Sequence, residues 1–313
     1  MTHSIAIILP AYNEEVTIES VIIEFNAALP EAEIYVINNN SKDRTAEIAR
    51  STLSNIGCKG SVIDEFQQGK GNAMRRAFLD IDVDIYVLAD ADLTYPAGRV
   101  RDLIAPVLSG QADMVVGDRH SGGHYSEQNK RSLHGFGNEL VKKMINMFFQ
   151  SSLKDIMSGY RVFNRKFVKN YPILVAGFQI ETELTLHALD KRFRIMELEI
   201  EYVDRPEGSY SKLNTIADGV KVIFTIFHIF RHYKPLRFYG FISLMMVITG
   251  VVSAIPVFHD WIAYRYIYHV PLAILATAFE IIAVVTISIG LILDSISHQE
   301  KMNYEMRLLS WRS

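Results

Sequence analysis

The chain has 313 residues, more than one average domain, and 49% of them are hydrophobic. Its formal net charge of -3 gives no support to a nucleic-acid partner, and its single cysteine, Cys58, excludes a disulfide framework within the chain. The apolar residues are unevenly spread, because residues 1–236 carry charges throughout whereas the last quarter holds two long apolar runs. The composition therefore predicts a soluble part followed by a membrane part.

Strand-like and helix-like patterns alternate four times in the first hundred residues. Apolar runs of strand length occupy residues 4–9, 33–37, 61–63 and 85–89. Each ends in a turn, and apolar residues at helical spacing follow. Such repeated units predict an α/β domain with a mostly parallel, Rossmann-like sheet and crossover helices.

The fourth run ends in two carboxylates, Asp90 and Asp92, one residue apart, and Pro96 follows. In an open α/β sheet the carboxyl ends of the strands are where ligands bind. Two carboxylates so close together favour a cation, and Mg²⁺ is usually held by one or two carboxylates together with substrate phosphates. An isolated Asp-x-Asp is also common in turns, so the interpretation depends on the strand before it and on companion motifs. The predicted ligand is a metal ion that carries a diphosphate.

The turns after the earlier strands carry residues suited to a nucleotide. Asn38, Asn39 and Asn40 offer amides that can read the edge of a base, although a helix-capping turn is an alternative and both can hold at once. Lys70 stands between two glycines at a helix start, where free N–H groups and the helix dipole favour an anion. The full phosphate-loop spacing of nucleotide triphosphatases is absent.

Further cations follow the Asp-x-Asp strand. Arg119 comes after a predicted strand at 112–116, and Lys130 and Arg131 follow a Gly-rich polar stretch. Together they could bind a second phosphate, separate from the predicted diphosphate, because Arg offers a planar bidentate fork. A solvated basic patch is the alternative.

Two later segments complete the candidate site. Glu181 and Glu183 begin a predicted helix, where they can serve as partners of the helix dipole. A strand predicted at 193–203 then leads into a Pro-, Gly- and Ser-rich loop that contains Arg205 and Lys212.

Four ordered motifs carry a family resemblance. The segment Pro10-Ala11-Tyr12-Asn13-Glu14, the turn at 38–45, the Gly69-Lys70-Gly71 turn and Asp90-Ala91-Asp92 fall in the order and spacing of family 2 glycosyltransferases with the GT-A fold. More narrowly, the whole chain resembles polyprenyl-phosphate and dolichyl-phosphate sugar synthases. The family usually has Asp-Asp-Gly-Ser where this chain has Asn-Asn-Asn-Ser at 38–41, so a contact to the base loses its charge.

The resemblance implies an inverting transfer of a sugar from a nucleotide diphosphate to polyprenyl phosphate, with Mg²⁺ or Mn²⁺ as cofactor. A UDP-hexose or UDP-N-acetylhexosamine and undecaprenyl phosphate are the expected substrates; the alternatives are GDP-mannose, a growing polysaccharide as acceptor, or a nucleotide-sugar-binding protein without catalysis. The predicted metal ligands are Asp90 and Asp92, and the predicted acceptor-phosphate residues are Arg119, Lys130 and Arg131. The predicted nucleotide- and donor-binding residues are Pro10, Ala11, Tyr12, Asn13, Glu14, Asn39, Lys70, Asp90, Ala91 and Glu181, and the predicted catalytic residues are Asp92, Arg119, Arg131, Arg205 and Lys212.

The last hundred residues predict membrane attachment. Residues 214–236 have the spacing of an interfacial amphipathic helix, with a core-packed helix as the alternative. Residues 238–258 and 270–293 are each long enough to span a bilayer, and only Glu280 interrupts the second run. Intramembrane carboxylates usually face protein, so this residue suggests packing or subunit contacts and a homo-oligomer.

The charges that flank the two runs predict the orientation. Arg265 is the only Lys or Arg in the link, whereas several basic residues flank the pair of runs on the other side. We therefore expect a multi-pass protein of the inner membrane with a cytosolic catalytic domain at 1–213, a juxtamembrane helix at 214–236, two spans within 237–294 and a cytosolic tail at 295–313.

Overall fold

The computed structural model of the chain describes residues 3–120, 132–177, 179–203, 227 and 229–310. It divides into two compact units, Met1–Gly219 and Val220–Ser313, which are described separately below. The predicted end of the catalytic domain at residue 213 and most of the predicted juxtamembrane helix lie outside the described residues, so both stay predictions.

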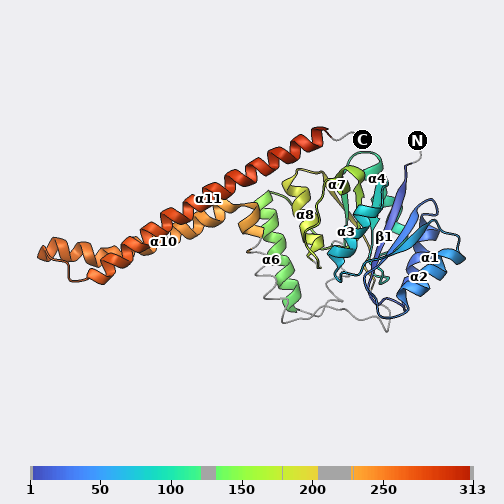
Figure 1. Cartoon of the computed structure of the whole chain (residues 1–313), viewed down its shortest axis with the longest axis horizontal. Helices are drawn as coiled ribbons and strands as arrows, with labels where there is room; N and C mark the ends of the chain where they lie inside the picture. The colour runs from blue at the N-terminus through green and yellow to red at the C-terminus, as the bar shows by residue number, and fades with distance from the viewer. Residues whose placement is uncertain (1–2, 121–131, 178, 204–226, 228, 311–313) are drawn as a thin grey trace. The chain divides into compact units, whose positions relative to one another are not determined.

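The first unit, coloured from blue to yellow in Figure 1, is built on a sheet whose described strands have the order β3-β2-β1-β4-β6-β5-β7. β6 pairs antiparallel with β4 and β5, and the remaining neighbours are parallel, as predicted. The strands are β1 (Ile5–Ala11), β2 (Glu33–Asn38), β3 (Gly60–Asp64), β4 (Ile85–Leu88), β5 (Met114–Asp118), β6 (Arg161–Asn164) and β7 (Ile195–Glu199).

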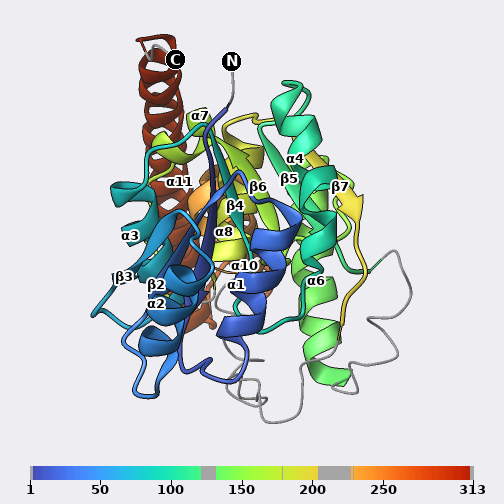
Figure 2. The same cartoon turned by 90° about the vertical axis from the view of Figure 1, so that its right-hand side faces the viewer.

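Helices cover both faces of this sheet (Figure 2). Alternate strand residues point to opposite faces, and on one face Ile7 of β1 joins a buried cluster with Ile22, Leu53 and Leu103. These three residues belong to α1, α2 and α4 respectively. The helices of this unit are α1 (Ile18–Ala28), α2 (Thr45–Asn55), α3 (Lys70–Asp80), the 3₁₀ helix η1 (Ala97–Arg99), α4 (Val100–Leu108), α6 (Ser132–Phe149), α7 (Arg165–Lys169) and α8 (Ile180–Asp190).

Aromatic side chains fill the other face. Phe78 of α3 meets Tyr86 of β4 and Phe163 of β6 at ring-centroid distances of 5.9 and 6.0 Å. Phe163 in turn stacks on Phe167 of α7 at 5.0 Å. Burial on both faces explains why the strands read as near-continuous apolar runs rather than as alternating patterns.

The parallel strands place several chain turns at one edge of the sheet. Ala11 at the end of β1 lies beside Asn38 at the end of β2, and Asn38 lies beside Asp64 of β3. Left-handed backbone follows β1, β2 and β4, at Asn13 (φ 52°), Asn40 (φ 58°) and Leu93 (φ 62°). Asn tolerates this conformation, whereas a Leu rarely adopts it. Strain of this kind concentrates at ligand sites.

The second unit contains two long helices, α10 (Pro235–Tyr264) and α11 (Val270–Ser310), which lie side by side (Figure 1). Both are long and apolar enough to cross a membrane, in agreement with the two predicted spans. The Ser243 hydroxyl donates to the Ala283 carbonyl at 2.9 Å, and Glu280 lies against Gly250.

Both helices are longer than the predicted spans. α10 starts within the segment predicted as juxtamembrane, and α11 continues through most of the predicted tail at 295–313. Hydropathy marks where apolar residues end, but Glu, Gln, Lys and Met are good helix formers and allow a helix to continue beyond that point.

Candidate active site

The turn after β1 and the turn after β2 are joined by hydrogen bonds. Asn13 donates its backbone N–H to the Ser41 hydroxyl at 3.1 Å and accepts from the Lys42 N–H at 2.8 Å. The Glu14 N–H donates to the Thr45 hydroxyl at 2.8 Å. Two of the motifs that the sequence singled out therefore lie together at the sheet edge.

Asn39 links the turn after β2 to the turn before α3. Its side-chain amide donates to the Gln67 carbonyl at 2.8 Å and accepts from the Gly69 N–H at 2.6 Å, and the residue is only 4% exposed. Both ends of the amide thus bond to backbone. These contacts give Asn39 a positioning role, and its predicted contact with a base stays a prediction.

Lys70 lies between two carboxylates that are distant in the sequence. Its ammonium contacts Asp90 Oδ1 and also Glu181 Oε1 at 2.5 Å. Burial by itself would lower the pKa of Lys70, but the charges of Asp90 and Glu181 outweigh it and raise this pKa. The structure thus gathers three of the predicted donor-binding residues into one buried ion cluster.

Two glycines allow the chain to hold Lys70 in this position. Gly69 has a φ of 133°, and a Cβ there would lie 2.1 Å from the Ala176 carbonyl oxygen. A Cβ at Gly71 would lie 1.9 Å from the Val175 carbonyl oxygen. The Gly71 N–H donates to the Ala176 carbonyl at 2.9 Å, so residues 175–176 cross the start of α3 at close range. A side chain at either glycine would force the two segments apart.

Asp92 is held by the turn that follows it. Its Oδ1 accepts from the Thr94 N–H at 3.2 Å and from the Thr94 hydroxyl at 2.5 Å, and the residue is buried. The left-handed Leu93 between them gives the chain the sharp bend that this contact requires. The Thr17 hydroxyl donates to the Ala91 carbonyl at 2.6 Å and fixes the same turn from α1's side.

Arg119 is anchored by a residue that sequence reasoning did not assign to the site. Its Nε and Nη2 donate to the Asp155 carboxylate at 2.7 and 3.0 Å, and its backbone N–H donates to the same group at 3.2 Å. Burial would raise the pKa of Asp155, but the Arg119 charge lowers it. A pairing across 36 positions leaves no signal in a single sequence.

The other predicted cations of the acceptor and closing loops, Lys130, Arg131, Arg205 and Lys212, lie outside the described residues. Among the predicted site residues that the structure describes, Lys70, Asp90 and Glu181 form one cluster, and Arg119 pairs with Asp155. The grouping of the acceptor cations stays a prediction.

Tyr95 and Gly159 also belong to this site, although they were not predicted as site residues. The Tyr95 hydroxyl accepts from the Gly159 N–H at 2.8 Å. A Cβ at Gly159 would lie 2.8 Å from Asp90 Oδ2 and 3.1 Å from Lys70 Nζ. Gly159 therefore packs directly against the Lys70–Asp90 pair.

Arg161 is fully buried and supports the backbone just before Gly159. It donates to the carbonyls of Ser158 and Ile156, each at 2.8 Å, and to the Thr185 hydroxyl at 2.9 Å. Its guanidinium thus satisfies the backbone of the 156–158 loop. This explains why the Ser-Gly-Tyr-Arg run has an arginine at its end.

The donor set fits a hard divalent cation. Asp90 and Asp92 supply carboxylate oxygens, the ligands that Mg²⁺ and Mn²⁺ prefer, and the Asp90 side chain is 28% exposed. Within the described residues no group of three or more His, Cys, Asp or Glu forms a complete protein cage. A site of two carboxylates that substrate phosphates complete is the usual arrangement for Mg²⁺.

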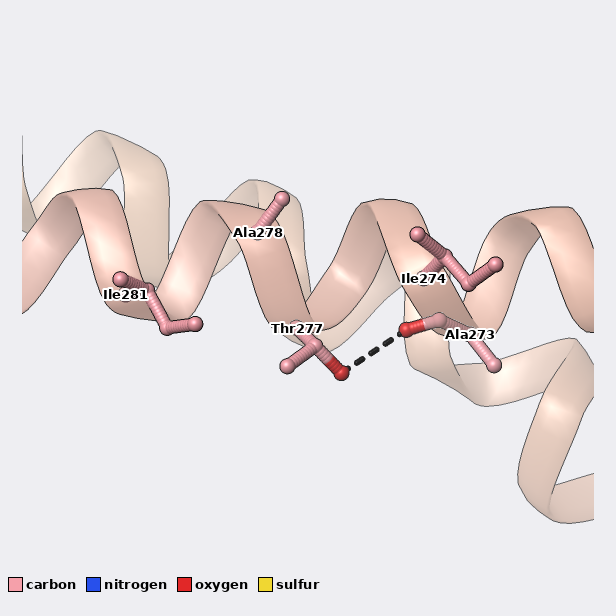
Figure 3. A pocket seen from close by; sticks show the side chains of 5 residues that line it. All are labelled: Ala273, Ile274, Thr277, Ala278 and Ile281. Carbon is pink, nitrogen blue, oxygen red and sulfur yellow. Dashed lines mark hydrogen bonds between the residues drawn. The ribbon is translucent and has the colours of Figure 1, made fainter.

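The second unit has an apolar hollow on α11 (Figure 3). Its lining has one polar side chain, Thr277, whose hydroxyl donates to the Ala273 carbonyl at 2.9 Å. Ile274, Ala278 and Ile281 complete it. We assign no polar ligand to this hollow.

A sheet of this order, with carboxylates after its fourth strand and a small-residue turn before α3, has the GT-A fold that the sequence resemblance predicted. The solved structures agree: glucosyl-3-phosphoglycerate synthase from Mycobacterium tuberculosis, in complex with Mn²⁺, UDP and phosphoglyceric acid, is 22% identical with a TM-score of 0.56. That likeness covers 72% of this chain and 78% of that one, and it establishes the fold.

The family model of "Glycosyl transferase family 2" matches residues 6–171, which is more than half of the chain. The chain therefore belongs to glycosyl transferase family 2, as the sequence resemblance predicted. It is similar to glycosyltransferase AglJ of Haloferax volcanii, 28% identical over 96% of both chains. It is also similar to a dolichyl-phosphate hexose transferase of the same organism, 27% identical over 70% of this chain and 90% of that one.

Proposed function

We propose that this protein is a membrane-anchored, inverting glycosyltransferase that moves a sugar from a nucleotide diphosphate to polyprenyl phosphate. The observation that carries the proposal is the cluster of Lys70, Asp90 and Glu181 beside the Asp92 turn, in a chain that also has two candidate membrane spans. Similarity to a dolichyl-phosphate hexose transferase over most of the chain supports a lipid-phosphate acceptor.

On this proposal Asp92, with Asp90, holds a divalent cation that offsets the negative charge of the departing diphosphate. Lys70 would keep Asp90 oriented, and Glu181 would contact the donor sugar. Asn13, Glu14 and Asn39 shape the nucleotide side through the hydrogen bonds that join their turns.

The acceptor needs orientation more than activation. A phosphate monoester has its second pKa near ~6, so its oxygen is largely ionised at neutral pH and can attack without a strong general base. Arg131 and Lys130, with Arg119 held by Asp155, would position that oxygen at the anomeric carbon. Arg205 and Lys212 would close over the diphosphate and exclude water.

The test is transfer by the full chain in detergent, with labelled UDP- and GDP-sugars and undecaprenyl phosphate. Label should move into an organic-soluble product, and excess chelator should abolish the transfer. Label that enters only a polysaccharide, or full activity in excess chelator, would contradict the proposal.

Asp92→Asn provides the residue-level test of the metal site. Asn keeps the oxygen that accepts from Thr94, so we expect normal folding. Activity should fall by about 100-fold, because the charge that stabilises the leaving diphosphate is lost. Asp102→Asn, at an exposed carboxylate in the first turn of α4 that pairs with Arg99, is the matched control and should keep full activity.

The donor base is proposed to be uracil, on the resemblance to bacterial polyprenyl-phosphate enzymes. Calorimetric titration with UDP and GDP in the presence of Mn²⁺ checks this. Tighter binding of GDP would assign the protein to GDP-sugar donors instead.

A further inference from the structure

Lys70 already supplies a cation to the carboxylate that the proposed metal site uses. Its ammonium contacts Asp90 and Glu181, and its side chain is only 10% exposed. Bulk water therefore compensates little for any loss of these contacts. A cation that approaches Asp90 must compete with one that is already there.

Charged side chains of both signs surround this pair. Arg119 pairs with Asp155, and the buried Arg161 donates to the backbone of Ile156 and Ser158 just before Gly159. The region contains three cations, Lys70, Arg119 and Arg161, and four carboxylates, Asp90, Asp92, Asp155 and Glu181. A dication alone or a diphosphate alone changes the local charge more than the two do together.

We propose that the Lys70 ammonium supplies, beside Asp90, the positive charge that the metal ion supplies when it is bound. Lys70 thereby makes metal binding and donor binding depend on each other. This inference rests on the proposed function, because it takes the Asp90–Asp92 turn as the metal site. A metal ion alone on Asp90 meets the positive charge of the ammonium, which contacts Oδ1 of the same carboxylate, and this repulsion pushes the ammonium toward Glu181.

The donor removes this penalty. An ammonium has three N–H donors, so Lys70 can stay with Glu181 while it gives its Asp90 contact to a phosphate oxygen. Asp90 is then available to the metal, and the phosphate satisfies Lys70. Binding free energies are reciprocal, so the metal must favour donor binding by the same factor by which the donor favours metal binding.

The experiment measures Mn²⁺ binding to the full chain in detergent by electron paramagnetic resonance, with and without UDP. In the unaltered protein UDP should raise Mn²⁺ affinity by about 5- to 150-fold, the usual range for coupled sites. Lys70→Met should bind Mn²⁺ alone about 10-fold more tightly, and the enhancement by UDP should fall below about 5-fold.

Two further variants make the result decisive. Lys59→Met removes an exposed lysine of the same unit and should match the unaltered protein. Glu181→Gln leaves Lys70 with Asp90 alone, so Mn²⁺ without UDP should bind more weakly and the enhancement should grow. This variant gives a test of opposite sign if Lys70→Met does not fold.

Equal enhancement in the unaltered protein, Lys70→Met and Glu181→Gln would overturn the role of Lys70 and leave the proposed function intact. If the unaltered protein binds no Mn²⁺ even with UDP, the metal site itself is wrong and the role of Lys70 is overturned with it.

Discussion

Gly159 offers a sharp single-residue test of the site, because its missing side chain leaves the space that the Lys70–Asp90 pair occupies. In Gly159→Ala the new Cβ would lie 2.8 Å from Asp90 Oδ2, so the carboxylate has to move. We expect UDP affinity in the presence of Mn²⁺ to fall about 10-fold, or about 1.4 kcal/mol, by calorimetry.

The matched control for this change is Gly98→Ala. Gly98 lies in η1, and a Cβ there meets nothing within 4 Å. Its UDP affinity should equal that of the unaltered protein. Normal UDP affinity in Gly159→Ala would mean that Asp90 can shift without consequence.

At the residue scale the sequence predicts those site residues that lie in short motifs. Lys70 is recognisable between its glycines and Asp90 by its place after a strand, because both signals are local. Asp155 and Tyr95 are not recognisable, since their roles depend on partners 36 and 64 positions away. The pairing of Lys70 with Glu181 likewise requires α3 and α8 to be brought together by the fold.

At the scale of elements, the loop between α6 and β6 depends on the Arg119–Asp155 pair. Asp155→Ala removes the carboxylate that accepts three hydrogen bonds from Arg119. The Arg119 guanidinium that remains belongs to a side chain that is only 11% exposed. Breaking a buried pair typically costs about 3–5 kcal/mol. Thermal unfolding of the full chain in detergent should show a clearly lowered midpoint.

Asp82→Ala is the control, because its pair with Arg165 is well exposed. Exposed pairs contribute about 0–1 kcal/mol, so its unfolding midpoint should hardly change. Equal midpoints for the two variants would contradict the anchoring role of Asp155.

The same pair predicts a pH dependence. Because Arg119 lowers the pKa of Asp155, the stabilisation is present above the ordinary carboxyl pKa of about 4 and is lost as pH falls through the lowered value. The difference in midpoint between Asp155→Ala and the unaltered protein should therefore persist from pH 7 to 5, where a proton on the neighbouring His120 can only strengthen the contact, and shrink below about pH 4. A difference that grows below pH 4 would have the wrong sign.

Strands that form apolar runs bounded by turn residues were predictable, whereas β6 was not. β1, β2 and β4 are runs of apolar residues with turn residues after them, which is a clear strand signal. β6 has four residues, and its antiparallel place between β4 and β5 follows from tertiary packing rather than from local pattern. In the second unit α10 and α11 extend beyond the predicted spans, because hydropathy does not mark where a helix ends.

At the scale of the whole molecule, the orientation of the two candidate spans can be tested by labelling. In a Cys58→Ser background, Tyr266→Cys lies in the link and Met306→Cys near the end of α11, both at exposed positions. Positive-inside logic puts the link outside. An impermeant maleimide should label the Tyr266→Cys protein in intact bacterial cells and the Met306→Cys protein only after lysis. The reverse pattern would place the catalytic unit outside the cytoplasm.

The last prediction separates the grip on the acceptor from the grip on the donor. Lys70 lies at the start of α3 in contact with Asp90, on the proposed nucleotide side. Arg131, outside the described residues, is proposed to hold the lipid phosphate. Removing a charge-assisted hydrogen bond costs about 1.5–3 kcal/mol, or about 10- to 150-fold. Arg131→Ala should therefore raise the KM for undecaprenyl phosphate by that factor and leave UDP binding unchanged.

The comparison with Lys70→Met makes this assignment testable in both directions. Lys70→Met should alter the interdependence of Mn²⁺ and UDP while the KM for the lipid stays nearly constant, because its partners Asp90 and Glu181 belong to the donor side. Arg131→Ala should do the opposite. If Arg131→Ala instead loses UDP affinity and keeps normal lipid kinetics, the basic pair Lys130-Arg131 serves the donor, and the acceptor phosphate must be held by other residues of the chain.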